Sequence, residues 1–218
     1  MDFNDCHYVG TVNAAGKRHG KGKLTFNSGT TYEGEFVDGT YKGFGTMKFA
    51  NGSVYTGQWD QGVRNGKGKS SYANGDSYLG SFANDKKHGE GIYFYKTGNT
   101  YYGGWHYDAR DGKGTYIFAN GEWYYGDYKM NTREGMGEYK NKNGEAYVGQ
   151  YAAGKRHGYG KYTYTSGATY EGDWVSDNKV GKGFYVFPNG ETYKGDYRGG
   201  YRNGHGVYTH LNGDIYDG

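Results

Sequence analysis

One short motif recurs along the whole chain at an almost constant spacing. A tyrosine followed two residues later by glycine begins at Tyr8, Tyr32, Tyr55, Tyr78, Tyr101, Tyr124, Tyr147, Tyr170, Tyr193 and Tyr216. The first interval is 24 residues and every later one is 23. A fixed period of this length is the signature of a repeat architecture, in which each unit contacts mainly its neighbours.

The residues available for a core are mostly aromatic. Leu, Ile, Val and Phe make up only about 12% of the chain, a fraction that signals disorder when net charge is also high. Here the formal net charge is +3, and aromatic residues reach 19%, with 28 tyrosines. Because each aromatic side chain can bury roughly 150–250 Å², the composition supports a folded core made of rings.

Each unit reads as two β-strands. The Tyr, the Gly and a further aromatic (Phe36, Trp59 and their equivalents) stand two residues apart, which is strand periodicity. A Gly-x-Gly segment such as Gly43/Gly45 marks the second strand, after six variable residues that we expect to form a loop. Asn-Gly joins most units, as at Asn51-Gly52, and predicts a two-residue hairpin turn with positive φ at both residues.

These features predict an all-β fold. We expect an elongated, twisted antiparallel β-meander or solenoid of about nine stacked 23-residue β-hairpin repeats. At about 4.8 Å per strand its strands would form a ribbon on the order of 85 Å long. Residues 1–7 are expected to be an N-terminal segment, and residues 8–218 a single repeat array with a terminal strand from Tyr216.

Segments such as "YEGEFVDGTYKGFGTMKFANG" and "YEGDWVSDNKVGKGFYVFPNG" resemble the MORN repeat, the membrane occupation and recognition nexus. The resemblance covers residues 8–218. It implies β-hairpins stacked into a curved sheet, as in junctophilins, plant phosphatidylinositol phosphate kinases and cytoskeletal or ciliary scaffolds. The first repeat, with its one-residue insertion, is also similar to the opening repeat of radial spoke head proteins of cilia.

Catalytic and cofactor sites are not predicted. The Gly-x-Gly pairs lack the spacing and the helix of a phosphate-binding loop. His19, His88 and His157 share one repeat position 69 residues apart, so at roughly 9.6 Å per unit they are too far apart to share a metal ion. The recurring carboxylates follow the period rather than converging. We expect no enzyme activity, no cofactor and no metal site.

A periodic row of cations, which we call the basic ladder, is the first candidate contact surface. Eight of nine equivalent positions are cationic, and we expect them in loops along one rim of the meander, where they could meet an acidic protein or anionic lipid. The repeated stretch "AAGKRHG", at residues 14–20 and 152–158, belongs to this connecting loop. The ladder consists of Arg18, Arg64, Lys87, Arg110, Arg133, Arg156, Lys179 and Arg202. The alternative is an ordinary solvated rim that discourages aggregation.

Apolar residues on the face opposite the rings are the second candidate contact surface. The second strands are mostly polar on that face, and the exceptions are Ile92, Phe94, Ile117, Phe184 and Val186. Ordinary strand propensity is the alternative explanation for them.

The sequence therefore favours a non-enzymatic scaffold that binds other proteins in a cytoskeletal or ciliary axonemal assembly, similar to a radial spoke head. We expect a cytoplasmic location, because the single cysteine, Cys6, suits a reducing compartment. Self-association through open strand edges is also predicted. The alternative function is a membrane-tethering adaptor that binds phosphoinositides through the basic ladder. No nucleic acid and no small-molecule substrate is predicted.

Overall fold

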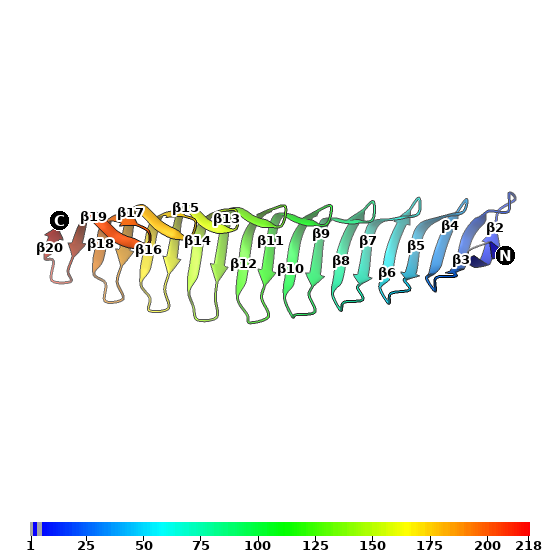
Figure 1. The fold of residues 1–218 in the computed structure, drawn as a ribbon, viewed down its shortest axis with the longest axis horizontal. Coiled ribbons are helices and arrows are strands. Elements are labelled where there is room, and N and C mark those ends of the chain that lie inside the picture. Colours follow the sequence, from blue (N-terminus) through cyan, green and yellow to red (C-terminus); the bar gives the residue numbers. More distant parts are fainter. Residues whose placement is uncertain (1, 4–5) are drawn as a thin grey trace. The chain divides into compact units, whose positions relative to one another are not determined.

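The fold consists of strands joined by tight turns (Figure 1). The computed structural model describes residues 2–3 and 6–218, and these residues form no helix. In this described part of the chain nothing helical has the length and apolar character needed to cross a bilayer. The predicted all-β meander of hairpins is confirmed.

The chain divides into two compact units, Met1–Ala109 and Arg110–Gly218. The sequence predicted one array over residues 8–218, and we describe the two units separately. In the first unit each strand pairs antiparallel with the next one along the chain. Its strands are β1 (Asp2–Phe3), β2 (Cys6–Val12), β3 (Arg18–Phe26), β4 (Thr31–Val37), β5 (Thr40–Lys48), β6 (Val54–Asp60), β7 (Val63–Ser71), β8 (Ser77–Ala83), β9 (Lys86–Phe94) and β10 (Thr100–His106).

The second unit has the same antiparallel order. Its first strand begins at the boundary residue Ala109. The strands are β11 (Ala109–Ile117), β12 (Trp123–Lys129), β13 (Thr132–Lys140), β14 (Ala146–Ala152), β15 (Lys155–Thr163), β16 (Thr169–Val175), β17 (Asn178–Val186), β18 (Thr192–Arg198), β19 (Tyr201–Thr209) and β20 (Ile215–Asp217).

The Asn-Gly connections have a different geometry from the one predicted. In the turn after β5, the amide of Gly52 donates to the Phe49 carbonyl at 2.9 Å, and the amide of Phe49 donates to the Ser53 carbonyl at 2.8 Å. Only the glycine has positive φ, 87°, while Asn51 does not. The Asn51 side chain instead accepts a hydrogen bond from the Ser53 amide at 2.9 Å. The prediction of positive φ at both residues was wrong, because the asparagine stabilises a longer turn through its side chain.

The predicted six-residue loops are also shorter than expected. Between β4 and β5 the turn is Asp38-Gly39, with φ of 49° and 93°. This is the two-residue turn with positive φ at both positions, whose twist matches that of the flanking strands. The remaining four loop residues extend the strands. In the first repeat, which has one inserted residue, Asn13–Lys17 form the turn, and the Asn13 amide donates to the Lys17 carbonyl at 2.9 Å.

A bulge accompanies the position of the basic ladder in most of the second strands, namely β3, β5, β7, β9, β13, β15, β17 and β19. On β6 and β7, Gly57 pairs with Gly68 and Trp59 pairs with Arg64, so one residue of β6 faces three of β7. Gly66, inside the bulge, has φ of 98°. A bulge bends the strand and re-aims its side chains. Arg64 thereby lies beside Trp59, within the paired strands and one step from the turn.

Candidate functional site: the two faces of the sheet

Each repeat tyrosine lies over a pair of glycines on one face of the sheet, which we call the ring face. Tyr55 has 0% exposure, and its hydroxyl donates to the Gln58 carbonyl at 2.9 Å. A Cβ on Gly68 would lie 2.6 Å from the Tyr55 Cζ, closer than real carbon contacts. The cross-strand glycines Gly57 and Gly68 therefore leave the space that the ring fills.

The rings of successive repeats interlock edge to face. Tyr55 contacts Trp59 of its own strand with ring centroids 5.1 Å apart and an interplanar angle of 89°. It contacts Phe82 of the next repeat at 5.1 Å and 83°. This arrangement is favourable because the positive edge of one ring meets the negative face of the other. The same contacts recur in the second unit, for example between Tyr147, Tyr151 and Trp174.

The basic ladder lies on this ring face and not on an exposed rim. The Arg64 guanidinium carbon is 5.5 Å from the Tyr55 ring centroid and 5.2 Å from that of Phe82. Its side chain is 22% exposed. A cation over an aromatic face is attracted by the ring quadrupole. The ladder residues Arg18, Lys87, Arg110, Arg133, Arg156, Lys179 and Arg202 also stand over rings.

The predicted placement of the ladder in rim loops was therefore wrong. The ladder positions are strand residues, and both copies of "AAGKRHG" end inside strands, so Arg18 lies in β3 and Arg156 in β15. The reason is that the turns contain only two residues, or five in the first repeat, and leave the cations within the paired region. Contact of the ladder with a partner or a lipid stays a prediction.

A turn carboxylate in the following repeat completes several of these cation sites. The Oδ1 atom of Asp85 accepts hydrogen bonds from both the amide and the Nε of Arg64, each at 2.9 Å. The equivalent bonds from Arg156 to Asp177 measure 3.1 and 3.0 Å. We call this arrangement the turn clamp. Sequence reasoning missed it, although an Asp or Asn recurs 21 residues after Arg64, Lys87, Arg110 and Arg156.

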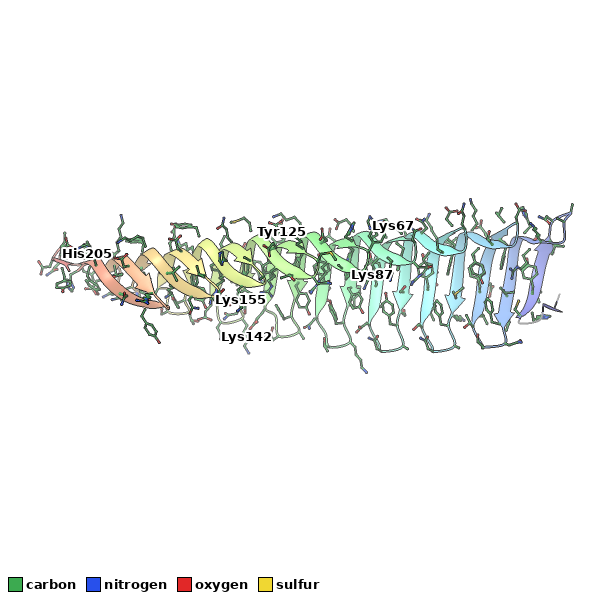
Figure 2. The ribbon with its side chains drawn as sticks, turned by 45° about the horizontal axis from the view of Figure 1, so that its top comes forward. Lys67, Lys87, Tyr125, Lys142, Lys155 and His205 are labelled. Atoms are coloured by element: carbon green, nitrogen blue, oxygen red, sulfur yellow. The ribbon has the colours of Figure 1, made fainter. Side chains whose placement is uncertain are left out.

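Two lysines occupy ladder positions and are surrounded by rings. The Nζ of Lys87 lies 4.5 Å from the ring centroids of both Tyr93 and Trp105. The Nζ of Lys179 lies 4.8 Å from that of Tyr170. Burial, with smaller contributions from the positive charges of two neighbouring arginines, lowers the pKa of Lys179. Figure 2 labels Lys87 on β9 together with Lys67 on β7.

The opposite side of the strands, which we call the outer face, carries the second set of predicted contact residues. Phe94, Ile117 and Phe184 are 43%, 47% and 41% exposed, and Ile92 and Val186 are half-buried. Their side chains are thus accessible, as the sequence predicted for that face. Their role in binding a partner stays a prediction.

The structure extends this apolar surface in the first unit. Ile92 pairs with Leu79 on β8 and with Tyr102 on β10, so the three residues form a row across three strands. Leu79 is 50% exposed and Tyr102 57%. We call Leu79, Ile92, Phe94 and Tyr102 the outer apolar row. Sequence reasoning missed Leu79 and Tyr102, although the middle residue of Tyr-x-Gly has the parity of the outer face.

In the second unit the outer face holds a shallow groove of about 570 Å³ on β15–β19. Phe184, Tyr159 and Val207 line it together with charged residues from the same strands. The charge of Lys182 is neutralised here, since its Nζ pairs with Asp196 at 2.7 Å. The groove therefore combines apolar side chains with balanced charge.

Comparison with known proteins assigns the repeats. The family model described as MORN repeat matches residues 14–31, 32–54, 55–77, 78–100, 101–123, 124–146, 147–169, 170–192 and 193–215. The chain belongs to the MORN repeat family. Such repeats suggest a protein-binding or scaffold role. The comparison with curated proteins found no match to this MORN repeat chain.

Several solved structures are similar to the MORN array in fold. The G-box domain of the microcephaly protein CPAP is 14% identical, with a TM-score of 0.50, over 91% of this chain and 98% of that one. The TCP10 domain of Danio rerio CPAP is 10% identical, with a TM-score of 0.46, over 95% and 92% of the two chains. The SAS-4 TCP domain of Drosophila melanogaster, solved with a proline-rich motif of Ana2, is 14% identical, with a TM-score of 0.46, over 70% and 83%. At these identities the likeness concerns the fold alone.

Proposed function

We propose that this MORN array is a non-enzymatic scaffold that binds other proteins through its outer face. The outer apolar row of β8–β10 carries the proposal, because it is a contiguous exposed apolar surface on strands that are otherwise polar there. Such surfaces mark sites of protein interaction. On the ring face the aromatic side chains already contact one another and the ladder cations.

The proposed setting is a cytoskeletal assembly, with a ciliary axoneme and a radial spoke head-like complex as the specific hypothesis. Structural analysis of the CPAP G-box domain suggests a role in centriole elongation for that protein. From it we take only the hypothesis that this scaffold also acts in a cytoskeletal structure. Imaging of the tagged chain in ciliated cells tests it, and exclusive staining away from cytoskeletal structures would contradict it.

Proximity labelling tests the binding surface directly. The wild-type chain is compared with Leu79→Ser/Tyr102→Ser, which removes two exposed apolar side chains of the row. The control is Val175→Ser, because Val175 is 46% exposed at the end of β16 and belongs to the other compact unit. We expect a set of labelled proteins to disappear with the double variant and to remain with the control. An identical labelled set for all three chains would contradict the proposal.

Membrane binding through the basic ladder ranks below protein binding. The ladder cations are held against rings, and Arg64 and Arg156 are also bonded to carboxylates. A cation held in this way gains little from a lipid headgroup. We expect no salt-sensitive flotation with phosphoinositide vesicles, and flotation that is lost when ladder residues are replaced would favour the membrane function.

Self-association through a sheet edge is a separate part of the proposal. Mass photometry over a range of concentrations tests it, with a rise of mean mass with concentration as the expected result. A constant monomer mass would contradict it without affecting the outer-face proposal.

A further inference from the structure

Two histidines face each other near the beginning of β9 and at the end of β10, at the opposite end of this strand pair from the turn that joins them. Gly89 pairs with Trp105, and one step further along the same antiparallel register His88 lies opposite His106. Their ring centroids are 5.3 Å apart, with an interplanar angle of 48°. The equivalent pair two repeats earlier, Lys42 and Asp60, forms an ion pair at 3.2 Å. Side chains at this pair of positions therefore reach each other.

Tyr107 completes a cluster of three rings. It is the first turn residue after β10, and its ring centroid lies 4.8 Å from that of His88 and 4.8 Å from that of His106. Solvent reaches the cluster, because Tyr107 is 51% exposed and His106 is also exposed. Small ions can therefore approach the two imidazoles.

The Nδ1 atom of His88 is buried and has no hydrogen-bond partner among the described residues. Buried polar atoms in native proteins are almost always paired, and an exception requires an explanation such as an ion or a water molecule. A neutral imidazole nitrogen without a proton is a ligand for zinc, copper or nickel. The unpaired Nδ1 atom is therefore available to bind a cation.

The spacing of the two rings fits metal coordination. On a tetrahedral zinc ion, with each nitrogen bound at about 2.1 Å, two imidazoles have their ring centres roughly 5 Å apart. The observed 5.3 Å separation agrees with this value. Among the described residues no group of three or more His, Cys, Asp or Glu side chains is placed to hold a metal ion. A site built on this pair would therefore leave coordination positions open to water or to another molecule.

We propose that His88 and His106 form a two-histidine site for a divalent transition-metal ion, with zinc and copper as the ions it accepts. Copper is expected to bind more tightly than zinc, following the general order for nitrogen ligands. Magnesium is expected not to bind, because it prefers oxygen ligands. An ion held in this way joins β9 to β10 and presents open coordination positions to solvent.

The repeat supplies matched controls. His19 and His157 occupy the same repeat position as His88, but the register places Val37 and Val175 opposite them. His19 and His157 therefore lack a second imidazole across the strand pair. Comparing variants of His88 with variants of His19 and His157 therefore distinguishes binding to the histidine pair from weak metal binding by single surface histidines.

Calorimetric titration of the untagged chain with ZnCl₂, CuCl₂ and MgCl₂ tests the proposal. We expect one saturable site for zinc and for copper and none for magnesium. His88→Gln and His106→Gln should each weaken the binding at least about tenfold, whereas His19→Gln and His157→Gln should leave it unchanged. Circular dichroism checks that each variant folds.

Nuclear magnetic resonance of the wild-type chain provides a second measurement, should a variant fail to fold. The imidazole signals of both His88 and His106 should shift on addition of zinc. No saturable zinc or copper binding, or binding that both glutamine variants retain, would overturn the proposal, as would imidazole shifts confined to other histidines.

Discussion

The two faces of β6 and β7 share one backbone, but side chains are packed on the ring face and exposed on the outer face. On the ring face, Tyr55, Trp59 and Arg64 contact one another and the following repeat. On the outer face, Lys67 and Lys69 are exposed and have no ion-pair partner among the described residues. The ring face therefore stabilises the sheet, and the outer face is free to vary. Stability and binding should accordingly respond to different substitutions.

The largest expected difference between the faces appears at alkaline pH. Burial raises the pKa of Tyr55 and Tyr147, both on the ring face, to about 12. In the unfolded chain a tyrosine ionises near pH 10, so above this pH the unfolded chain loses protons that the folded chain keeps. The stability contribution of each tyrosine is fully present below pH 10 and falls by about 1.4 kcal/mol per pH unit until the folded state ionises near pH 12.

Urea unfolding followed by circular dichroism between pH 8 and 11 measures this loss. Tyr55→Phe removes one ionising group, so its free energy of unfolding should fall less steeply above pH 10. A stability that stays constant from pH 9 to 11 would show that the ring-face tyrosines are not protected.

Filling the glycine space should be the next largest effect. In Gly68→Ala the new methyl group would meet the Tyr55 ring, so the ring must move, at a cost of about 1–3 kcal/mol for overpacking. Lys69 is the next residue along β7 and lies on the outer face. Lys69→Ala should therefore change the free energy of unfolding by less than about 0.5 kcal/mol. Equal losses for the two variants, measured by urea unfolding, would remove the distinction between the faces.

Replacing a cation on the ring face should lower stability more than replacing one on the outer face, by a smaller margin than in the preceding comparisons. Arg64→Gln removes the contacts with Tyr55 and Phe82 and the bond from Nε to Asp85. It should cost about 1.5–3 kcal/mol, the range for a hydrogen bond to a charged group. Lys67→Gln on the same strand should be within about 0.5 kcal/mol of wild type. Thermal unfolding compares them, and a neutral Arg64→Gln would return the basic ladder to a binding role.

The smallest effect concerns the turn clamp. Gly154, with φ of 80°, stands in the turn between β14 and β15 where Asp85 and Asp177, with φ of 65° and 70°, stand in other repeats. Gly154→Asp should supply the missing carboxylate to Arg133 and stabilise the chain by about 0.5–1 kcal/mol. Gly154→Ala, which has no carboxylate and must adopt positive φ, should cost about 1–2 kcal/mol. Chemical unfolding of both variants measures these changes. A Gly154→Asp variant that is less stable than wild type would contradict the stabilising role of the turn clamp.

The repeat period predicted the fold well because the same strand motif occurs in every repeat. A tyrosine, a glycine and an aromatic two residues apart specify one face of a strand, and each copy repeats that constraint. The parity of Phe94 and Phe184 also placed them correctly on the outer face. The turns were predicted less well, since Asn51 acts through its side-chain hydrogen bond to Ser53 rather than through its own backbone angles.

The sequence by itself determined the repeat, the strands and the pairing of rings with glycines, because these depend on spacing along the chain. Only the tertiary structure decided what each side chain meets in the next strand. A two-residue turn and a glycine bulge brought Arg64 under the rings and beside Asp85, although a loop had been expected there. The same register set His88 against His106 but His157 against Val175. His88 and His106 belong to successive repeats, and the sequence alone shows only that they are 18 residues apart. The antiparallel pairing shows that residues with this spacing lie across from each other.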